Sequence, residues 1–409
     1  MVRPSSFPEI PMPNATALLE NLRLSELAPH LIQSEIRAMT VACSDAGGIN
    51  MAQGVCDTDP PHPVVEAAID AIRAGHNIYT RMDGIAPLRE AIAQKLAAFN
   101  HIHADPHTQI LVTSGATGAM YAALMALLNA GDDCLILEPY YGYHVSTLRT
   151  LRINPVVVPL TGPDFALDPS RIRAAITPRT RAIILNSPAN PSGKVFTLAE
   201  LEALAAIATE YDLFVFTDEM YEHFIYDGAH HLSIAALSGM QERTITISGF
   251  SKTFSVTGWR LGYLAASERW IPAIAYFHDL IYICAPSPLQ YGAAAGLLQL
   301  PASFYTSLTA EYQTKRDAIC DALTRAGLTP SIPTGAYYVL ADATRIPGAT
   351  APQKARHLLA DTGIAAVAGS AFFQTQAGIN PGDHLLRFCF AKKQHDLDEA
   401  VRRLGRYGG

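Results

Sequence analysis

Residues 110–128 read ILVTSGATGAMYAALMALL, a short β-branched and apolar run followed by small residues and then by a helical pattern. Apolar runs of the same kind recur along the chain to about residue 266, and they read CLILEPYY, VVVPL, RAIILN, LFVFTDE, TITIS and LGYLAA. Helix-like stretches such as LAELEALAAIATEY lie between them. This alternation predicts a mostly parallel α/β sheet, and runs that are apolar throughout are typical of strands covered by helices on both faces.

The sequence on either side of this region predicts further parts of the fold. Four prolines within residues 1–13 favour an extended arm, and an amphipathic helix is expected within residues 25–40. After Pro301, a helical stretch, the run YYVLAD, a helix near residues 354–361 and the run LLRFCFA predict a smaller α+β domain. We therefore expect an arm with part of the small domain in residues 1–45, a large domain in 46–303 and a small domain in 304–409.

Composition narrows the classes of function. The 409 residues are 49% hydrophobic and 16% charged, with a formal charge of −7, so the chain supplies no basic surface for nucleic acid or anionic membranes. The six cysteines lie far apart and form no Cys-X-X-Cys pair for zinc or redox work. No signal peptide and no membrane-spanning run of about 18 apolar residues is recognised. A reducing, cytoplasmic location is expected.

Several familiar motifs are incomplete in this chain. A dinucleotide fingerprint needs three glycines in the pattern Gly-X-Gly-X-X-Gly, whereas the turn after residue 114 offers only Gly115 and Gly118, with Ala116 between them. The segment PANPSGK has Pro188 where a Walker A loop begins with glycine. The segment GFSKT lacks the last glycine of a nucleophile elbow, and Gly249 stands where a serine-X-X-lysine motif has its serine. The histidines at 101, 103 and 107, beside Asp105, are read as a solvated loop, so no metal site is expected.

Four segments instead form an ordered set: SGATGA, NSPANPSGK, TDEMYEH and SGFSKTFSVTGWRLGY. Each follows a predicted strand, and ligands of open α/β sheets bind at the carboxyl ends of the strands. Their order, spacing and residue types resemble the class I/II aminotransferases of the fold type I family of enzymes that use pyridoxal 5′-phosphate (PLP). The resemblance covers nearly the whole chain and implies that the large domain binds PLP.

The resemblance implies a role for each polar residue of the set. Lys252 matches the lysine that forms the Schiff base and then acts as the base that moves the proton, a task suited to a desolvated amine. Asp218 matches the carboxylate that keeps the pyridine nitrogen of PLP protonated. Tyr221 and Asn190 match the groups that donate to the phenolic oxygen of PLP and so lower the pKa of the Schiff base. Tyr141 matches the aromatic side chain that stacks on the ring.

The resemblance implies that the cofactor phosphate is bound by the backbone after the first strand, at Gly115, Ala116 and Thr117. Ser251 and the side chain of Arg260 are expected to complete the phosphate site. An arginine fork suits phosphate geometry, and the helix that starts after Ser114 directs N–H groups toward an anion. Many relatives have a serine at the position of Gly249, with Ser248 beside it here, so one phosphate hydrogen bond is expected to be missing or shifted.

Substrate recognition is implied in part. Arg387 matches the arginine that pairs with the substrate α-carboxylate, and its place in the small domain would let substrate close that domain. Gly54 and Asn190 match residues near the same carboxylate. Tyr79 matches a tyrosine that reaches the cofactor phosphate of the neighbouring subunit, which implies a homodimer with shared sites.

Two departures bear on specificity. Thr117 stands where some aspartate-specific relatives carry a lysine for a distal carboxylate, so a preference for dicarboxylates alone is not expected. Cys56 stands where relatives commonly have proline, so the entrance loop is expected to differ, and the thiol itself is read as an ordinary loop cysteine.

The expected function is transfer of the amino group of a neutral, aromatic or long-chain L-amino acid to a 2-oxo acid. A C–S lyase or a synthase similar to aminocyclopropane-carboxylate synthase remains the alternative on the same fold, because the reaction depends on which bond stands perpendicular to the ring. A PLP-binding regulator without catalytic activity is a third hypothesis, although the chain has no basic helix for a DNA-binding domain.

Overall fold

A computed structural model describes residues 24–28 and 35–407. All helices and strands below belong to one unit, Ser34–Gly409. The arm expected in residues 1–13 lies outside the described residues. Of the helix expected within residues 25–40, helix α2 (Glu35–Asp45) covers the last part and continues past it. In the part of the chain that the structure describes, no helix is long and apolar enough to cross a membrane.

The large sheet has seven strands in the order β2-β8-β7-β6-β5-β3-β4. They are β2 (Ile110–Ser114), β3 (Asp133–Glu138), β4 (Asn154–Pro159), β5 (Thr180–Asn186), β6 (Phe214–Asp218), β7 (Thr244–Gly249) and β8 (Leu261–Ala265). Only β8 runs antiparallel to its neighbours β2 and β7 among these strands. The sheet is therefore mostly parallel, as the sequence predicts.

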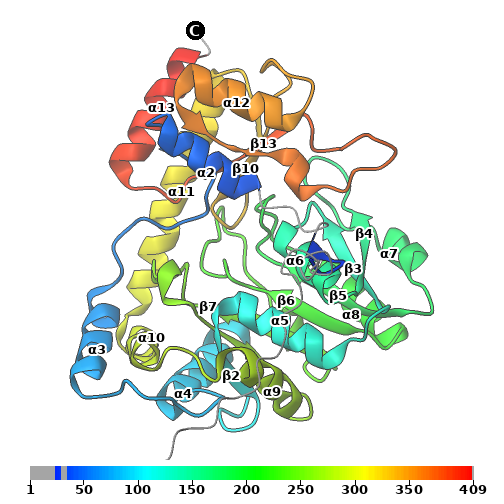
Figure 1. Cartoon of the computed structure of the whole chain (residues 1–409), viewed down its shortest axis with the longest axis vertical. Helices are drawn as coiled ribbons and strands as arrows, with labels where there is room; N and C mark the ends of the chain where they lie inside the picture. Colours follow the sequence, from blue (N-terminus) through cyan, green and yellow to red (C-terminus); the bar gives the residue numbers. More distant parts are fainter. Residues whose placement is uncertain (1–23, 29–34, 408–409) are drawn as a thin grey trace, which may run out of the picture. The chain divides into compact units, whose positions relative to one another are not determined.

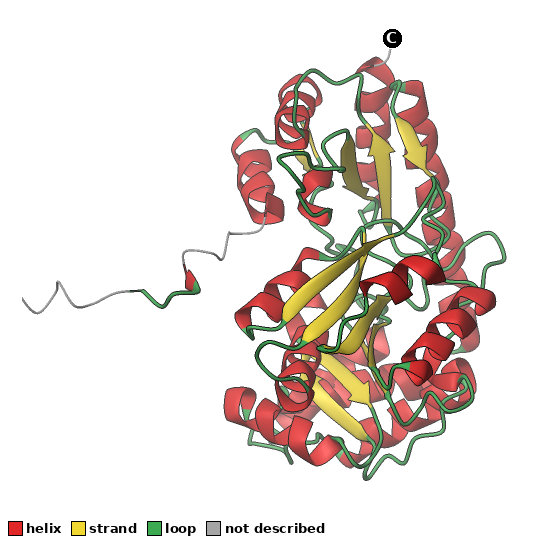
Figure 2. Cartoon of the chain, turned by 90° about the vertical axis from the view of Figure 1, so that its right-hand side faces the viewer, coloured by secondary structure: helices red, strands yellow, loops and turns green. Residues whose placement is uncertain are grey.

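Helices cover both faces of this sheet (Figures 1 and 2). One face packs against α5 (Gly115–Leu127), α6 (Gly142–Thr150) and α9 (Ile271–Tyr282), mainly through buried aliphatic side chains. The opposite face packs against α7 (Pro169–Ala175) and α8 (Leu198–Glu210) near β5, and against α3 (His62–Arg73), α4 (Ala86–Lys95) and α10 (Ser287–Gln299) near β2 and β8. Helix α4 continues as a π-helical turn, η2 (Leu96–Asn100), and the 3-10 turns η3 (Ile234–Ala236) and η4 (Thr257–Trp259) lie in connections.

A smaller antiparallel sheet, in the order β12-β13-β10-β9, forms at the other end of the unit (Figure 1). Its strands are β9 (Thr329–Ser331), β10 (Tyr338–Asp342), β12 (Val367–Ala368) and β13 (Leu385–Cys389), and the helices beside it are α11 (Ala302–Arg325), α12 (Ala351–Thr362) and α13 (Gln394–Tyr407). The 3-10 turn η5 (Gly369–Phe372) follows β12, and β1 (Ile49–Asn50) pairs in parallel with β11 (Ile364–Ala365). The α+β composition agrees with the sequence, while the boundaries at residues 45 and 303 stay predictions.

Candidate active site

The polar segments of the sequence meet at one edge of the large sheet. Strands β2, β3, β5, β6 and β7 all end at this edge, and the antiparallel strand β8 begins there. A cavity of about 710 Å³ opens at the edge. Eleven of the thirteen site residues expected from the sequence line it: Gly54, Ala116, Thr117, Tyr141, Asn190, Asp218, Tyr221, Ser251, Lys252, Arg260 and Arg387. The cavity has the size of a cofactor site.

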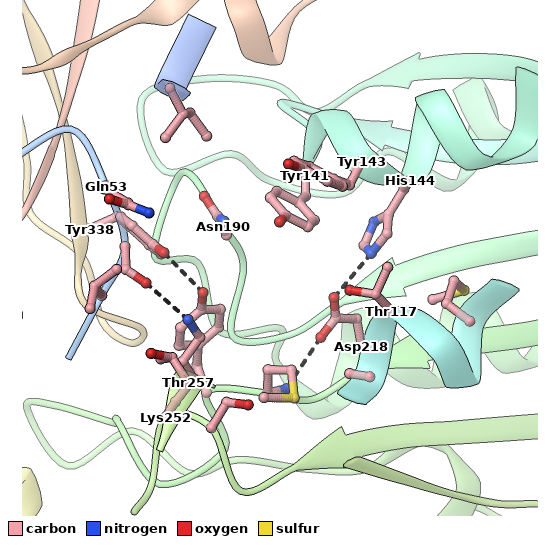
Figure 3. A pocket seen from close by; sticks show the side chains of 18 of the residues that line it. Gln53, Thr117, Tyr141, Tyr143, His144, Asn190, Asp218, Lys252, Thr257 and Tyr338 are labelled. Carbon is pink, nitrogen blue, oxygen red and sulfur yellow. Dashed lines mark hydrogen bonds and ion pairs between the residues drawn. The ribbon is translucent and has the colours of Figure 1, made fainter. Parts of the chain in front are cut away.

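Lys252 enters the cavity from the loop after β7, on the side opposite Asp218 (Figure 3). Its Nζ donates to the carbonyl oxygen of Gly54 at 2.9 Å. Burial lowers the pKa of the ammonium, and the charge of Arg260 acts in the same direction. A lysine with a lowered pKa holds more neutral amine near pH 7, which is the form that attacks a carbonyl carbon.

Asp218 ends β6 and points into the cavity beside His144 of α6 (Figure 3). The Nε2 atom of His144 lies 3.0 Å from Oδ2 of the carboxylate, and the N–H of Met220 donates to Oδ1 at 3.3 Å. Both oxygens are therefore held in place at the wall of the cavity. An oriented carboxylate at this depth is suited to an N–H⁺ of a ring bound in the cavity.

Tyr141 caps the start of α6 and supplies an aromatic wall of the cavity. Its ring stacks on Tyr143 with a centroid distance of 5.3 Å and meets the edge of His144 at the same distance. Figure 3 shows these three residues together above Asp218. A flat ring bound in the cavity would therefore find a rigid aromatic partner.

The turn between β2 and α5 forms the end of the cavity suited to an anion. Gly115 has a φ of +72°, and a Cβ atom there would lie 2.6 Å from Nη2 of Arg260. Arg260 itself has a left-handed backbone, with φ of +55°, and its Nη1 donates to the carbonyl of Thr257 at 3.1 Å. The N-terminus of the 13-residue helix α5 and the guanidinium thus approach each other closely, an arrangement that attracts phosphate.

Arg387 lies in β13 and is 1% exposed. Its Nη1 donates to Oδ1 of Asn190 at 2.9 Å and its Nη2 to the carbonyl of Ala52 at 2.6 Å, while Nε has no hydrogen-bond partner. None of the ion pairs within residues 24–28 and 35–407 supplies a carboxylate to this side chain. A buried cation without a counter-ion is costly, so the site is electrostatically suited to an incoming carboxylate.

The departures noted in the sequence have structural reasons. A Cβ atom on Gly249 would lie 3.0 Å from both the Cα of Gly262 and the carbonyl oxygen of Leu261, so a serine there would meet the backbone of β8. Ser248 does not replace it, because its hydroxyl donates to Glu222 at 2.8 Å and the residue does not line the cavity. Cys56 lies in a loop but is buried, with its thiol 3.6 Å from the carbonyl oxygen of Lys252.

Two expected site residues do not line the cavity of the single chain. Gly115 leaves free the space that Arg260 occupies, because a Cβ atom there would lie 2.6 Å from Nη2 of the arginine. Tyr79 lies in the loop before α4 with 75% of its surface exposed. The proposed role of Tyr79 therefore requires a second subunit.

The structure also adds residues that the sequence did not single out. His144 beside Asp218, Tyr338 beside Tyr221, and Gln53, Tyr143 and Thr257 on the cavity wall are the clearest cases (Figure 3). The position of His144, three residues after Tyr141 in EPYYGYH, would have been a usable signal, because this spacing is close to one helical turn. Tyr338 gave no such signal, since it lies in the apolar run YYVLAD.

Known proteins share this fold and these segments. Residues 46–404 match the family described as aminotransferase class I and II. The probable N-succinyldiaminopimelate aminotransferase of Mycobacterium tuberculosis is 36% identical over 94% of this chain and 98% of its own length, and a solved structure of that enzyme superposes with a TM-score of 0.89 over all of its chain. Aromatic-amino-acid aminotransferase 2 of Thermococcus litoralis is 34% identical over 94% of this chain and 97% of its own. YbdL of Escherichia coli, whose structure and reactivity identified a methionine aminotransferase function, superposes with a TM-score of 0.88 at 32% identity over 94% of this chain and 99% of its own.

Proposed function

Because the chain belongs to the class I and II aminotransferases, which use pyridoxal phosphate, we propose that it transfers the amino group of a neutral, aromatic or long-chain L-amino acid to a 2-oxo acid. The single observation that carries the site assignment is the juxtaposition of Lys252 with Arg387 at one cavity. Lys252 is a buried amine with a lowered pKa, and Arg387 is a buried cation that has no counter-ion among the described residues.

The residues present fit the cofactor. Arg260, Ser251 and the backbone at Gly115, Ala116 and Thr117 would hold its phosphate, and Tyr141 would face its ring. Asp218 would pair with the ring nitrogen, while Tyr221 and Asn190 would donate to the phenolic oxygen. When bound, pyridoxal phosphate withdraws electrons from the bonds at the substrate α-carbon.

The chain's own residues supply the remaining tasks. Arg387 and the Asn190 amide bind the α-carboxylate next to Gly54 and so orient the bonds at the α-carbon. The Lys252 amine would act as the base that removes the proton from the substrate α-carbon and holds it for transfer. Tyr141 and Tyr143 would form an aromatic wall beside the bound ring.

The cavity lining supports the proposed donor class. Apolar and aromatic side chains of the cavity lining, among them Ile36, Val55 and Tyr143, suit an uncharged donor side chain. Thr117 offers no cation to a distal carboxylate, as the sequence indicates. Arg37 of α2 also lines the cavity and is exposed, so it offers a positive charge to the second carboxylate of an acceptor such as 2-oxoglutarate.

We also propose a homodimer with shared sites, in which the partner's Tyr79 reaches the phosphate, and a reducing, cytoplasmic location. The exposure of Tyr79 and Ile78, at 75% and 79%, supports an additional partner for this loop. The six cysteines, all free, are consistent with a reducing compartment.

The proposed reaction is tested with the purified holoenzyme and a panel of L-amino acids, first without and then with 2-oxoglutarate or pyruvate. A transaminase converts one equivalent of donor per site and turns over only after a 2-oxo acid is added. Continuous release of ammonia and a 2-oxo acid without an acceptor would establish a lyase instead. Phenylalanine, methionine and leucine should outperform aspartate as donors, and a strong preference for aspartate would contradict the proposed donor class.

A further inference from the structure

Tyr338 places a second buried hydroxyl against Tyr221. The two phenolic oxygens lie 3.0 Å apart, and either is able to donate to the other. Tyr338 is 2% exposed and Tyr221 is 5% exposed, so water does not compete for this hydrogen bond. Figure 3 shows Tyr338 at the wall of the cavity, on the same side as Lys252.

The ring of Tyr338 is fixed from several directions. It projects from β10, where Tyr338 is paired with Cys389 of β13. The guanidinium of Arg387 lies 4.3 Å from the ring centroid, a cation–π contact. At the tip of the side chain, a Cβ atom on residue 54 would lie only 1.8 Å from the hydroxyl oxygen, so the hydroxyl occupies space that Gly54 leaves open.

Other donors near the pair are already engaged elsewhere. Lys252 Nζ donates to the Gly54 carbonyl at 2.9 Å, and the hydroxyl of Tyr337 donates to the same oxygen at 3.1 Å. Among the hydrogen bonds of the described residues, Tyr338 is the one partner of the Tyr221 hydroxyl. The direction of this hydrogen bond therefore decides where the proton of Tyr221 points.

The inference rests on the proposed function, in which Tyr221 faces the phenolic oxygen of the cofactor. An anionic oxygen is a stronger acceptor than a neutral hydroxyl, so Tyr221 would direct its own proton to the cofactor. The free lone pair of Tyr221 then accepts from Tyr338, and a hydroxyl that accepts a hydrogen bond becomes a better donor. We propose that Tyr338 is a positioning residue that donates to Tyr221 and strengthens the hydrogen bond from Tyr221 to the cofactor's phenolic oxygen.

The proposal is tested by a spectrophotometric pH titration of the holoenzyme's visible absorption band. Tyr338→Phe keeps the ring under Arg387 and removes the hydroxyl. The pH midpoint of the titration should therefore rise by about half a unit to one unit, which is the effect expected from the loss of one neutral hydrogen bond. Tyr226→Phe is the matched control. It removes a buried hydroxyl, bonded to the carbonyl of Ala336, from the same core cluster without touching Tyr221. The pH midpoint of the Tyr226→Phe titration should equal that of the unaltered protein.

A double-mutant cycle shows whether Tyr338 acts through Tyr221. The variant Tyr221→Phe/Tyr338→Phe should titrate like Tyr221→Phe alone. An equal shift from Tyr338→Phe in both backgrounds, or no shift in either, would overturn the proposal. Failure of the protein to form any visible band would instead count against the proposed function, so the two failures are distinguishable.

A second variant covers the case in which Tyr338→Phe does not fold. Site-specific 3-fluorotyrosine at position 338 retains the shape and hydroxyl of the residue but makes the hydroxyl a stronger donor. The midpoint should then fall. A rise or an unchanged midpoint would contradict donation from Tyr338 to Tyr221.

Discussion

At the scale of single residues, Asp218 depends on neighbours that orient its carboxylate. His144 holds Oδ2 from α6, and the backbone of Met220 holds Oδ1. His144 is itself buried against the edge of Tyr141. The aspartate is thus the group that contacts the cofactor in our proposal, and the histidine acts through it.

We expect Asp218→Asn to lower kcat by about 10²–10³-fold, because an amide does not stabilise a positive charge on the ring nitrogen. His144→Gln should cost less, about 10–100-fold, since the carboxylate remains and only its orientation is relaxed. Single-turnover rates with saturating donor measure both losses. A larger loss for His144→Gln than for Asp218→Asn would reverse these roles.

Residue types and order allowed most of the site to be predicted from the sequence. Lys252, Asp218 and Arg387 each lie in a recognisable segment, and the structure brings all three to one cavity. Tyr338 was not predictable in this way, because a tyrosine in an apolar strand has the same pattern as a core residue. Its role becomes visible only when β10 is placed beside the loop after β6.

At the scale of elements, a buried polar network joins the end of α4 to the loops that carry the site. Lys95 pairs with Glu222 at 2.5 Å, Asn100 of the π-helical turn donates to Glu222 at 2.9 Å, and Ser248 of β7 donates to the other carboxylate oxygen. The network therefore connects the loop of Tyr221 to the strand that precedes Lys252. Its role is structural, since the Lys95 ammonium pairs with the buried carboxylate of Glu222.

Because of this network, the free energy of unfolding is expected to depend on pH under acidic conditions. Burial alone would raise the pKa of Glu222, but the Lys95 ammonium, with His223 and His231, lowers it to about 2. Because the folded pKa lies below the ordinary value of 4.5, the contribution is complete above pH 4.5 and is lost as pH falls toward 2. The urea concentration at the unfolding midpoint of the unaltered protein should therefore decrease as the pH is lowered from 4.5 to 2.

Two variants test the contribution. Glu222→Gln should lower the urea midpoint at pH 7 and flatten its dependence between pH 4.5 and 2. Glu399→Gln is a control, because that carboxylate also has a lowered pKa but lies at the surface on α13. If Glu222→Gln leaves the midpoint at pH 7 unchanged, the network does not stabilise the fold.

Strands and helices with a strong sequence pattern were predicted well. The direction of β8 and the pairing of the strands were not predicted. The apolar runs marked the strands of the large sheet, but nothing in LGYLAA showed that β8 runs antiparallel. That direction follows from where the chain re-enters the sheet, and it brings Arg260 to the same edge as the ends of the parallel strands. The two-stranded pair of β1 with β11 was also not predictable, since each strand has two residues.

At the scale of the whole molecule, exposed apolar side chains support the proposed dimer. Besides Ile78 and Tyr79, helix α9 exposes Tyr276 and Leu280, at 58% and 63%. Surfaces of this kind are typical of sites that contact another protein. In a symmetric dimer each site would combine Lys252 of one subunit with the partner's Tyr79.

Subunit complementation tests this sharing directly. Lys252→Ala and Tyr79→Ala subunits should each give weak or inactive dimers, whereas their heterodimer contains one site with both residues unaltered. Random co-assembly in equal amounts makes half of the dimers mixed, each with one of two sites intact, so activity should reach about a quarter of the unaltered level. A mixture no more active than its parents would contradict shared sites.

The central claim is that Lys252 binds pyridoxal phosphate covalently and exchanges it with amino donors. The most direct measurement is the visible absorption spectrum of the PLP-reconstituted protein and of Lys252→Ala, each recorded before and after addition of an L-amino acid. We predict that the unaltered protein has a visible band, which the amino acid bleaches and a 2-oxo acid restores. Lys252→Ala should lack this band before any amino acid is added. A protein that acquires no such band, or a band that persists unchanged in Lys252→Ala, would contradict the claim.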